Sequence, residues 1–263
     1  MHLSYNDDDI FVSTGGRAFD ASGEVLLFIH GSGQSHLTFL QQGRFFANRD
    51  WQVLNPDMPA HGHSGGTPLT TISVMSDWYA GLMDELGIKS ATIIGHSQGC
   101  LVGLELAKNH PEKVKKLCLV AGSMAIPVND ALLDMAKNKP KDAYQAMVDW
   151  AHASDSHLYE HSWPGFTHID FGKQVMAANQ HNALFADLNA CNIYKDGQDA
   201  ANSVTCPAIT ILASQDKMTP AKAGKQMADA INDCELHIIE DAGHFLLSER
   251  PFETNKIIRN FIS

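Results

Sequence analysis

Two near-identical pentapeptides hold the serines that could act as nucleophiles in this chain. GHSGG occupies residues 62–66 and GHSQG occupies residues 95–99. Both fit Gly-x-Ser-x-Gly, the pattern in which a strand turns sharply into a helix and presents a reactive serine hydroxyl. Such a serine can attack an acyl carbon if a base and an orienting acid lie beside it. The surrounding sequence must decide which serine has these neighbours.

The flanking residues favour Ser97 over Ser64. Residues 90–95, SATIIG, predict a buried strand just before Ser97, and residues 100–110, CLVGLELAKNH, predict a helix just after it. The N-terminus of that helix would also favour the negative charge that develops during acyl transfer. Ser64 follows Pro59 and precedes GGTP, which cannot begin a helix promptly. We therefore interpret Ser64 as a loop residue.

A candidate acid and a candidate base follow two later predicted strands. Residues 207–214 predict a strand with Asp216 just beyond its end, and residues 235–240 predict another with His244 just beyond its end. The order serine, acid, histidine, with each partner after a strand, is the one expected around such a nucleophile. The chain has 14 histidines, but none of the others follows a late strand. The sequence thus predicts a triad of Ser97, Asp216 and His244.

Acyl transfer also requires hydrogen-bond donors for the oxyanion of the transition state. The backbone N–H of Gln98, the residue after the nucleophile, is the first expected donor. We expect the second from Ser32, in the loop HGSGQS at residues 30–35 that follows the first buried strand. Gly33 would replace Ser32 as the donor if this loop turned differently.

Alternating strands and helices would position these residues. Further buried strands are predicted at 24–30, 51–57 and 114–120, and further helices at 71–87, 220–232 and 251–262. This alternation implies an α/β fold with a mostly parallel, doubly wound sheet and helices on both faces. The first 20 residues predict one or two antiparallel edge strands.

The alternation stops at residues 123–203, which lack buried strand patterns and are mostly helical. We interpret this stretch as a helical cap, or lid, inserted after the strand at about 114–120 and overhanging the end of the sheet. The core would then comprise residues 1–122 and 204–263. Methionine and aromatic residues in the cap suggest an apolar pocket, although packing within the cap explains them equally well.

Composition limits the partners and the compartment. The chain has 263 residues, of which 44% are apolar and 19% charged, enough for a sizeable core. A formal net charge of −11 argues against nucleic acid and anionic membranes as partners. No apolar run approaches the roughly 18 residues of a membrane span, and the polar N-terminus is not a signal peptide. Five cysteines without C-x-x-C spacing predict reduced thiols, no zinc site and a cytoplasmic protein. The oligomeric state is left open.

Five segments, in order, resemble the α/β-hydrolase superfamily in its lidded serine esterase, lipase and lactonase branch. They are FIHGSG, NPDMPAHGHS, IIGHSQG, PAITILASQDKMTP and DAGHFLLSERP, within residues 24–122 and 204–262. The resemblance implies an α/β-hydrolase fold, with the nucleophile, acid and base at Ser97, Asp216 and His244 and the oxyanion donors at Ser32 and Gln98. The NPDMPAHGHS segment is a structural loop in that family.

The resemblance and the triad together imply a serine hydrolase that cleaves a carboxylic ester, a lactone or a related acyl compound through an acyl-enzyme intermediate. This chemistry needs no metal or organic cofactor, and the expected partner is a small, apolar acyl substrate. Carbon–carbon bond hydrolases, acyltransferases and perhydrolases use the same triad and are alternatives, as is a non-catalytic small-molecule receptor on the same fold. HGSG at 30–33 also resembles the carbon–carbon bond hydrolases of aromatic ring cleavage, although Gln34 breaks their longer HGSGPG.

Overall fold

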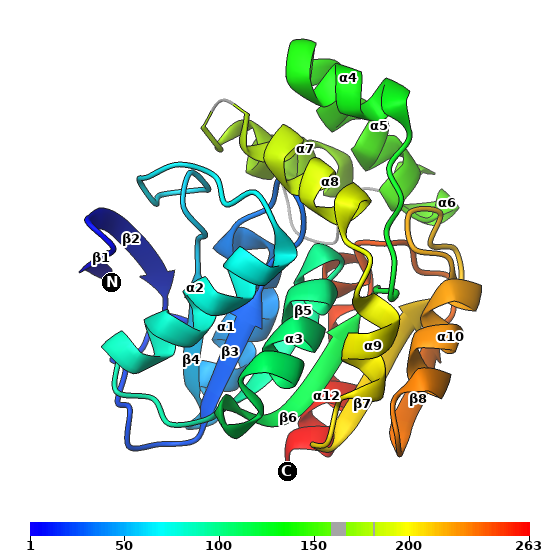
Figure 1. Ribbon diagram of the computed structural model, residues 1–263. Helices are drawn as coiled ribbons and strands as arrows, with labels where there is room; N and C mark the ends of the chain where they lie inside the picture. Colours follow the sequence, from blue (N-terminus) through cyan, green and yellow to red (C-terminus); the bar gives the residue numbers. More distant parts are fainter. Residues whose placement is uncertain (159–166, 181) are drawn as a thin grey trace.

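The computed structural model describes residues 1–158, 167–180 and 182–263, in which eight strands form one sheet (Figure 1). The strands are β1 His2–Tyr5, β2 Asp8–Ser13, β3 Val25–Ile29, β4 Gln52–Pro56, β5 Ala91–His96, β6 Val114–Val120, β7 Ala208–Ala213 and β8 Cys234–Ile239. Their order across the sheet is β1-β2-β4-β3-β5-β6-β7-β8. Pairs β1–β2 and β2–β4 are antiparallel and the remaining pairs are parallel. The fold class predicted from the sequence is confirmed, including the antiparallel N-terminal edge.

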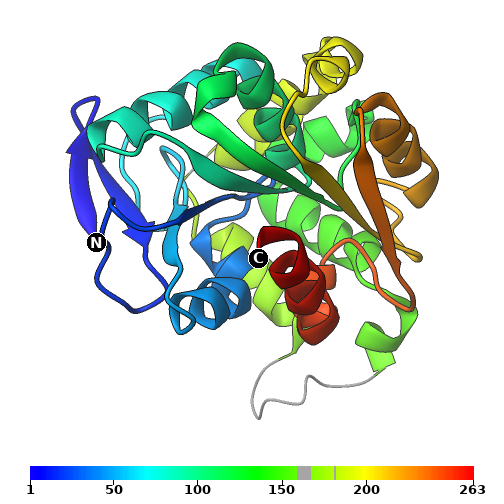
Figure 2. The ribbon, with the colours of Figure 1, turned by 90° about the horizontal axis from the view of Figure 1, so that it is seen from below.

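The central strands are buried on both faces because helices cover both sides of the sheet (Figure 2). Successive side chains of a strand point to opposite faces. Leu26 and Phe28 of β3 therefore belong to one core cluster, while Leu27 and Ile29 belong to the other. The cluster of Leu26 and Phe28 includes residues of α1 Leu40–Ala47, α11 Leu246–Glu249 and α12 Pro251–Ile262. The cluster of Leu27 and Ile29 includes residues of α2 Ile72–Glu85, α3 Gln98–Asn109, α9 Gly197–Asn202 and α10 Ala221–Ala230. Short 3-10 helices lie at His36–Phe39 and Pro111–Lys113.

The order of the strands creates a switch point between β3 and β5. After β3 the chain moves outward to β4, and it then crosses back to form β5 on the other side of β3. In doubly wound sheets, ligands bind outside the carboxyl ends of the strands at such a point. The loops that follow β3 and β5 carry Ser32 and Ser97, so two of the predicted site residues lie beside this crevice.

Five helices between β6 and β7 lie above the carboxyl ends of the strands (Figure 1). They are α4 Asp130–Asn138, α5 Pro140–Ala151, α6 Ser154–Leu158, α7 His168–Ala177 and α8 Ala183–Ile193. Their own apolar cluster includes Met147, Met176 and Leu188, and Phe245 of the core packs against it. The next helix, α9, lies beside α3 in the core layer. Residues 159–166 and 181 of the predicted cap lie outside the described residues.

The described residues contain neither a membrane-spanning helix nor a disulfide. The longest helix, α2, has 14 residues, and none is long and apolar enough to cross a membrane. All five cysteines are free, and Cys100, Cys118 and Cys191 are buried. Burial raises the pKa of each of these three thiols, which keeps them protonated.

Candidate active site

Ser97 occupies a strained turn between β5 and α3. Its backbone has φ 56° and ψ −118°, a conformation with positive φ that a residue with a side chain rarely adopts. A Cβ atom at position 95 would lie 2.2 Å from the carbonyl oxygen of Gly99, and one at position 99 would lie 2.1 Å from that of Ile29. Both glycines of the motif are therefore required by close backbone contacts.

Asp216 and His244 meet above the carboxyl ends of β7 and β8. His244 Nδ1 lies 2.8 Å from Asp216 Oδ2, and both side chains are at most 2% exposed. Asp216 Oδ1 accepts the backbone N–H groups of Met218 and Thr219 at 2.8 and 2.9 Å, and Thr219 Oγ1 donates to Oδ2 at 2.8 Å. Burial alone would raise the pKa of Asp216, but His244 and these hydrogen bonds outweigh it and lower the pKa below its ordinary value. The carboxylate is thus held ionised against the imidazole.

Ser97 is not hydrogen-bonded to this pair, but the residue before it contacts His244. Its side chain has no hydrogen-bond partner among the described residues, and the residue is 8% exposed. The preceding residue, His96, donates from Nε2 to the carbonyl oxygen of His244 at 2.8 Å, and the two rings lie 4.9 Å apart. The structure therefore brings the three predicted residues to one edge of the sheet, with the Ser97–His244 hydrogen bond unformed.

The loop after β3 lies directly against the nucleophile. A Cβ atom at Gly31 would lie 2.9 Å from that of Ser97. The N–H of Gly31 is bonded to Gln34 Oε1 at 3.1 Å, and the N–H of Gly33 is bonded to Asp187 Oδ2 at 2.7 Å. The N–H of Ser32 has no acceptor within the described part of the chain. Of the two candidate donors in this loop, the structure favours Ser32, because Gly33 is already engaged.

Ser64, the serine of the other pentapeptide, has a structural place. Its hydroxyl donates to the carbonyl oxygen of Asp57 at 2.8 Å and accepts the N–H of Phe11 at 3.0 Å. It is 4% exposed and links the loop after β4 to strand β2. Two satisfied buried hydrogen bonds stabilise the loop and leave the hydroxyl no role as a nucleophile.

Two residues that sequence reasoning did not single out lie in this region. Thr219 contacts both Asp216 and His244, its Oγ1 lying 3.2 Å from His244 Nδ1. Asp187, on α8, reaches from the cap to the loop after β3 and is fully buried. The signal for Asp187 was the one charged residue near the centre of a mostly apolar helical segment, 183–193. A buried carboxylate of this kind requires partners, and those partners identify its role.

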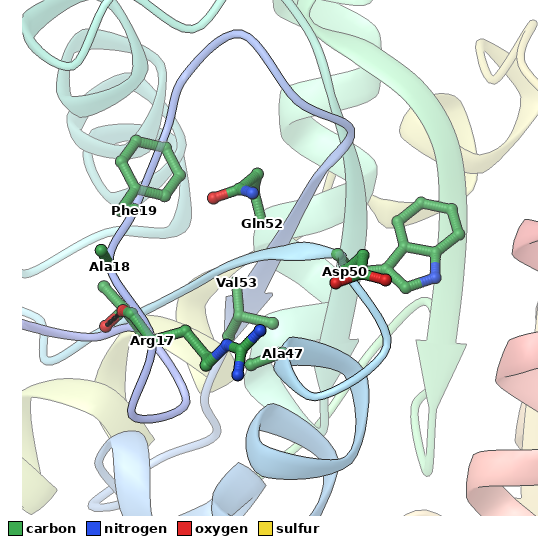
Figure 3. Close-up of a pocket in the computed structure, with 9 residues that line it drawn as sticks. Arg17, Ala18, Phe19, Ala47, Asp50, Gln52 and Val53 are labelled. Atoms are coloured by element: carbon green, nitrogen blue, oxygen red, sulfur yellow. Dashed lines mark hydrogen bonds between the residues drawn. The ribbon is translucent and has the colours of Figure 1, made fainter.

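Neither of two pockets in the described part of the chain is lined by Ser97, Asp216 or His244. A pocket of about 290 Å³ lies near the amino end of β4, lined by Arg17, Phe19, Asp50, Gln52 and other residues (Figure 3). A second crevice, of about 20 Å³, lies between α7 and the residues after His244, including Phe245 and Leu247. Within the described ranges, no group of three or more His, Cys, Asp or Glu side chains could hold a metal ion.

The fold and the site together define an α/β-hydrolase architecture with a serine turn, an acid and a histidine at the carboxyl edge of the sheet. A family model described as "Alpha/beta hydrolase family" matches residues 26–257. The chain belongs to this family.

Several relatives and solved structures are similar over nearly the whole chain. A 2-hydroxy-6-oxononadienedioate/2-hydroxy-6-oxononatrienedioate hydrolase from Pseudomonas sp. is 27% identical, covering 91% of this chain and 88% of the relative. A putative carbamate hydrolase RutD from Caulobacter sp. is 26% identical, covering 95% of this chain and 93% of the relative. The enol-lactonase from Burkholderia xenovorans superposes with a TM-score of 0.87 at 21% identity, covering 100% of this chain and 99% of that one. These hydrolases share a fold but differ in the bond they cleave, so the reaction must be argued from the site.

Proposed function

We propose that this protein is a serine hydrolase that cleaves a carboxylic ester, a lactone or a related acyl compound through an acyl-enzyme intermediate. The observation that carries the proposal is the pairing of His244 Nδ1 with Asp216 Oδ2 at 2.8 Å, beside Ser97 in its strained turn. An imidazole paired in this way has its Nδ1 proton directed at the carboxylate, which leaves Nε2 free to act as a base.

The reaction would proceed in two acyl transfers. The Ser97 hydroxyl attacks the carbonyl carbon of the substrate while His244 Nε2 takes its proton, and the imidazolium then protonates the leaving group. Water, deprotonated by His244, releases the acyl group in the second step. Asp216 stabilises the imidazolium in both steps. The Ser97–His244 hydrogen bond must form for this purpose, and such bonds are often long in substrate-free enzymes and shorten when substrate binds.

The backbone N–H groups of Ser32 and Gln98 would stabilise the oxyanion. Gln98 is the first residue of α3, so its N–H has no acceptor within the helix. Ser32 presents its N–H from the loop that packs against Ser97. Two such donors, already oriented before reaction, typically contribute about 2.7–4 kcal/mol each to transition-state stabilisation.

The acyl group of the substrate would occupy the crevice between α7 and Phe245. Its lining is largely apolar and includes Val175, Met176 and Leu247. A volume of about 20 Å³ accommodates roughly one water molecule, so a substrate must displace these side chains to bind. We therefore expect small acyl groups to be preferred over long ones.

Cleavage of a carbon–carbon bond is a second candidate, supported by the Pseudomonas relative, whose name describes a hydrolase of a 2-hydroxy-6-oxo dienedioate. The same triad would act on a keto group next to the bond that breaks. We place this reaction second because Gln34 departs from HGSGPG, the longer loop motif of such enzymes.

The cysteines bear on the compartment. We place the protein in the cytoplasm, supported by its five free cysteines. The net charge of −11 gives no support to nucleic acid as a partner.

Replacement of the nucleophile tests the proposal. Ser97→Ala should abolish hydrolysis of short p-nitrophenyl esters and covalent labelling by a fluorophosphonate probe, because both reactions would use the Ser97 hydroxyl as the nucleophile. Ser64→Ala is the matched control and should be labelled normally. Wild-type turnover by Ser97→Ala would refute the assignment. A screen of short esters, lactones and ring-cleavage products with the wild-type protein then separates the two candidate reactions.

A further inference from the structure

Gly33, next to the candidate oxyanion donor Ser32, is hydrogen-bonded to the cap through both of its backbone polar groups. Its N–H donates to Asp187 Oδ2 on α8 at 2.7 Å. Its carbonyl oxygen accepts from Asn179 Nδ2, just after α7, at 2.7 Å. We call Asp187 and Asn179 the Gly33 clamp. These two groups belong to the successive peptide units on either side of the Gly33 Cα atom. With both units hydrogen-bonded, the clamp restricts the backbone dihedral angles of Gly33 and so the path of the loop that carries Ser32.

Packing against α8 adds to the restraint. Gly33 has φ +66°, in the left-handed region, and a Cβ atom there would lie 2.7 Å from Leu184 Cδ1 on α8. The helix therefore approaches the loop as closely as a glycine allows. One turn after Asp187, Cys191 Sγ lies 3.6 Å from Ser32 Oγ.

The second candidate donor is tied to the same residue of the cap. Gln98 Nε2 donates to the backbone carbonyl oxygen of Asp187 at 2.9 Å. Asp187 thus contacts the loop that carries Ser32 through its side chain and the residue Gln98 through its backbone. The two segments that would bind the oxyanion come from different parts of the core, and Asp187 joins them.

His61 provides the charge that makes this buried carboxylate tolerable. Its Nε2 lies 2.9 Å from Asp187 Oδ2, and its Nδ1 lies 3.0 Å from the carbonyl oxygen of Pro59. Because both neighbours are acceptors, both ring nitrogens must carry protons. Burial opposes this charge, but Asp187 outweighs it and raises the pKa of His61 above its ordinary value. The clamp therefore rests on a buried ion pair, which is costly to break from one side.

We propose that Asp187 and Asn179 are positioning residues that set the geometry of the oxyanion hole, so that these two side chains of the cap promote acyl transfer without touching the substrate. This inference rests on the proposed serine hydrolase function. If the clamp merely attached the cap, its loss would weaken folding or substrate binding. If it orients Ser32 and Gln98, its loss must lower kcat.

The test compares clamp variants with a matched variant on the same helix. Asp187→Ala should lower kcat for p-nitrophenyl acetate by about 10- to 100-fold. This loss is smaller than the roughly 100- to 1000-fold loss typical of removing one oxyanion donor, because the donors would be misdirected and not removed. KM should change less than about threefold, since the mispositioned groups act on the transition state. Asp187→Asn, which keeps an acceptor for Gly33, should recover part of the loss, and Asn179→Ala should lower kcat by about tenfold.

Asn192→Ala is the control. Asn192 also lies on α8 and accepts the N–H of Val128 at 3.1 Å, so its loss loosens the cap without touching the oxyanion loop. Its kcat should stay within about twofold of wild type. Thermal unfolding followed by circular dichroism establishes that each variant is folded. If Asp187→Ala does not fold, the kcat of Asn179→Ala tests the proposal, because Asn179 is only half-buried.

Three outcomes would overturn the proposal: unchanged kcat in the folded clamp variants, a change confined to KM, or an equal loss of kcat in Asn192→Ala. Failure of the underlying function has a different signature, namely a wild-type protein whose labelling and turnover survive Ser97→Ala. Loss of labelling in Ser97→Ala together with unaltered clamp variants would refute the positioning role alone.

Discussion

Acidification from about pH 7 to about pH 5 should destabilise this protein, and the buried histidine His30 should contribute a measurable part of the loss. The ring is fully buried at the end of β3, next to the loop that carries Ser32. Its Nε2 accepts the N–H of Met58 at 3.2 Å, so the proton is on Nδ1, which donates to the carbonyl oxygen of Gly31 at 3.0 Å. Protonation of Nε2 would point two N–H groups at each other. Burial, with the nearby His61, lowers the pKa of His30 from 6.5 to about 4.

The size of the effect follows from proton linkage. The unfolded chain takes up a proton near pH 6.5, whereas the folded protein does so only near pH 4, so the unfolded state binds more protons between these values. Stability is therefore unaffected above the unfolded pKa and is lost as the pH falls toward the folded pKa. At about pH 5 the cost is about 2 kcal/mol, against about 0.2 kcal/mol at about pH 7. A loss of this size is a large share of the total stability of a typical domain.

Urea unfolding of the wild type and of His30→Gln at both pH values measures the contribution of His30 to the free energy of unfolding. Between about pH 7 and about pH 5, the wild type should lose about 2 kcal/mol more than the variant, which has no titrating group at this position. Each protein is compared with itself, so the packing lost in the variant cancels. His96 and His152, whose pKa values burial lowers to about 3 and about 4, add losses of the same sign in both proteins. A variant that loses as much stability as the wild type would refute the reasoning.

Two further substitutions address the triad and the turn. Thr219→Val removes the hydroxyl that donates to Asp216 Oδ2 at 2.8 Å, so kcat for a short ester should fall about tenfold with KM unchanged. Steady-state kinetics equal to wild type would show that the backbone N–H groups of Met218 and Thr219 are enough to hold the Asp216 carboxylate. Gly99→Ala places a Cβ atom 2.1 Å from the carbonyl oxygen of Ile29. Because this oxygen belongs to the backbone of β3, the free energy of unfolding should fall by about 3 kcal/mol or more, and a near-wild-type value in urea unfolding would mean that the turn can open.

The strands and the turn at Ser97 could be predicted because their signals are local. An apolar run such as residues 91–96 forms a strand buried on both faces wherever helices cover the sheet. The glycines at positions 95 and 99 make close contacts within the turn and with the adjacent strand, where a side chain would clash. The Gly-x-Ser-x-Gly pattern includes both glycines, so it predicts this turn. The sequence could likewise reject Ser64, because no strand and helix flank it.

The contacts between the cap and the core could not be predicted in this way. Gly33 and Asp187 are 154 residues apart in the chain. A local sequence pattern cannot predict that an acid in one helix contacts a glycine in so distant a loop. The choice between Ser32 and Gly33 as a donor depended on that contact, because Asp187 occupies the N–H of Gly33. The sequence could name both candidates but had no means to choose between them.

For this protein, the order of residues along the chain determined the α/β architecture and placed a serine, an acid and a histidine each after a strand, since these features follow from short-range patterns of burial and turn formation. The tertiary structure decided which groups meet: Thr219 with the Asp216–His244 pair, and Asp187 with His61, Gly33 and Gln98. The physical reason is that burying a charge or fixing a peptide depends on partners brought together only by folding.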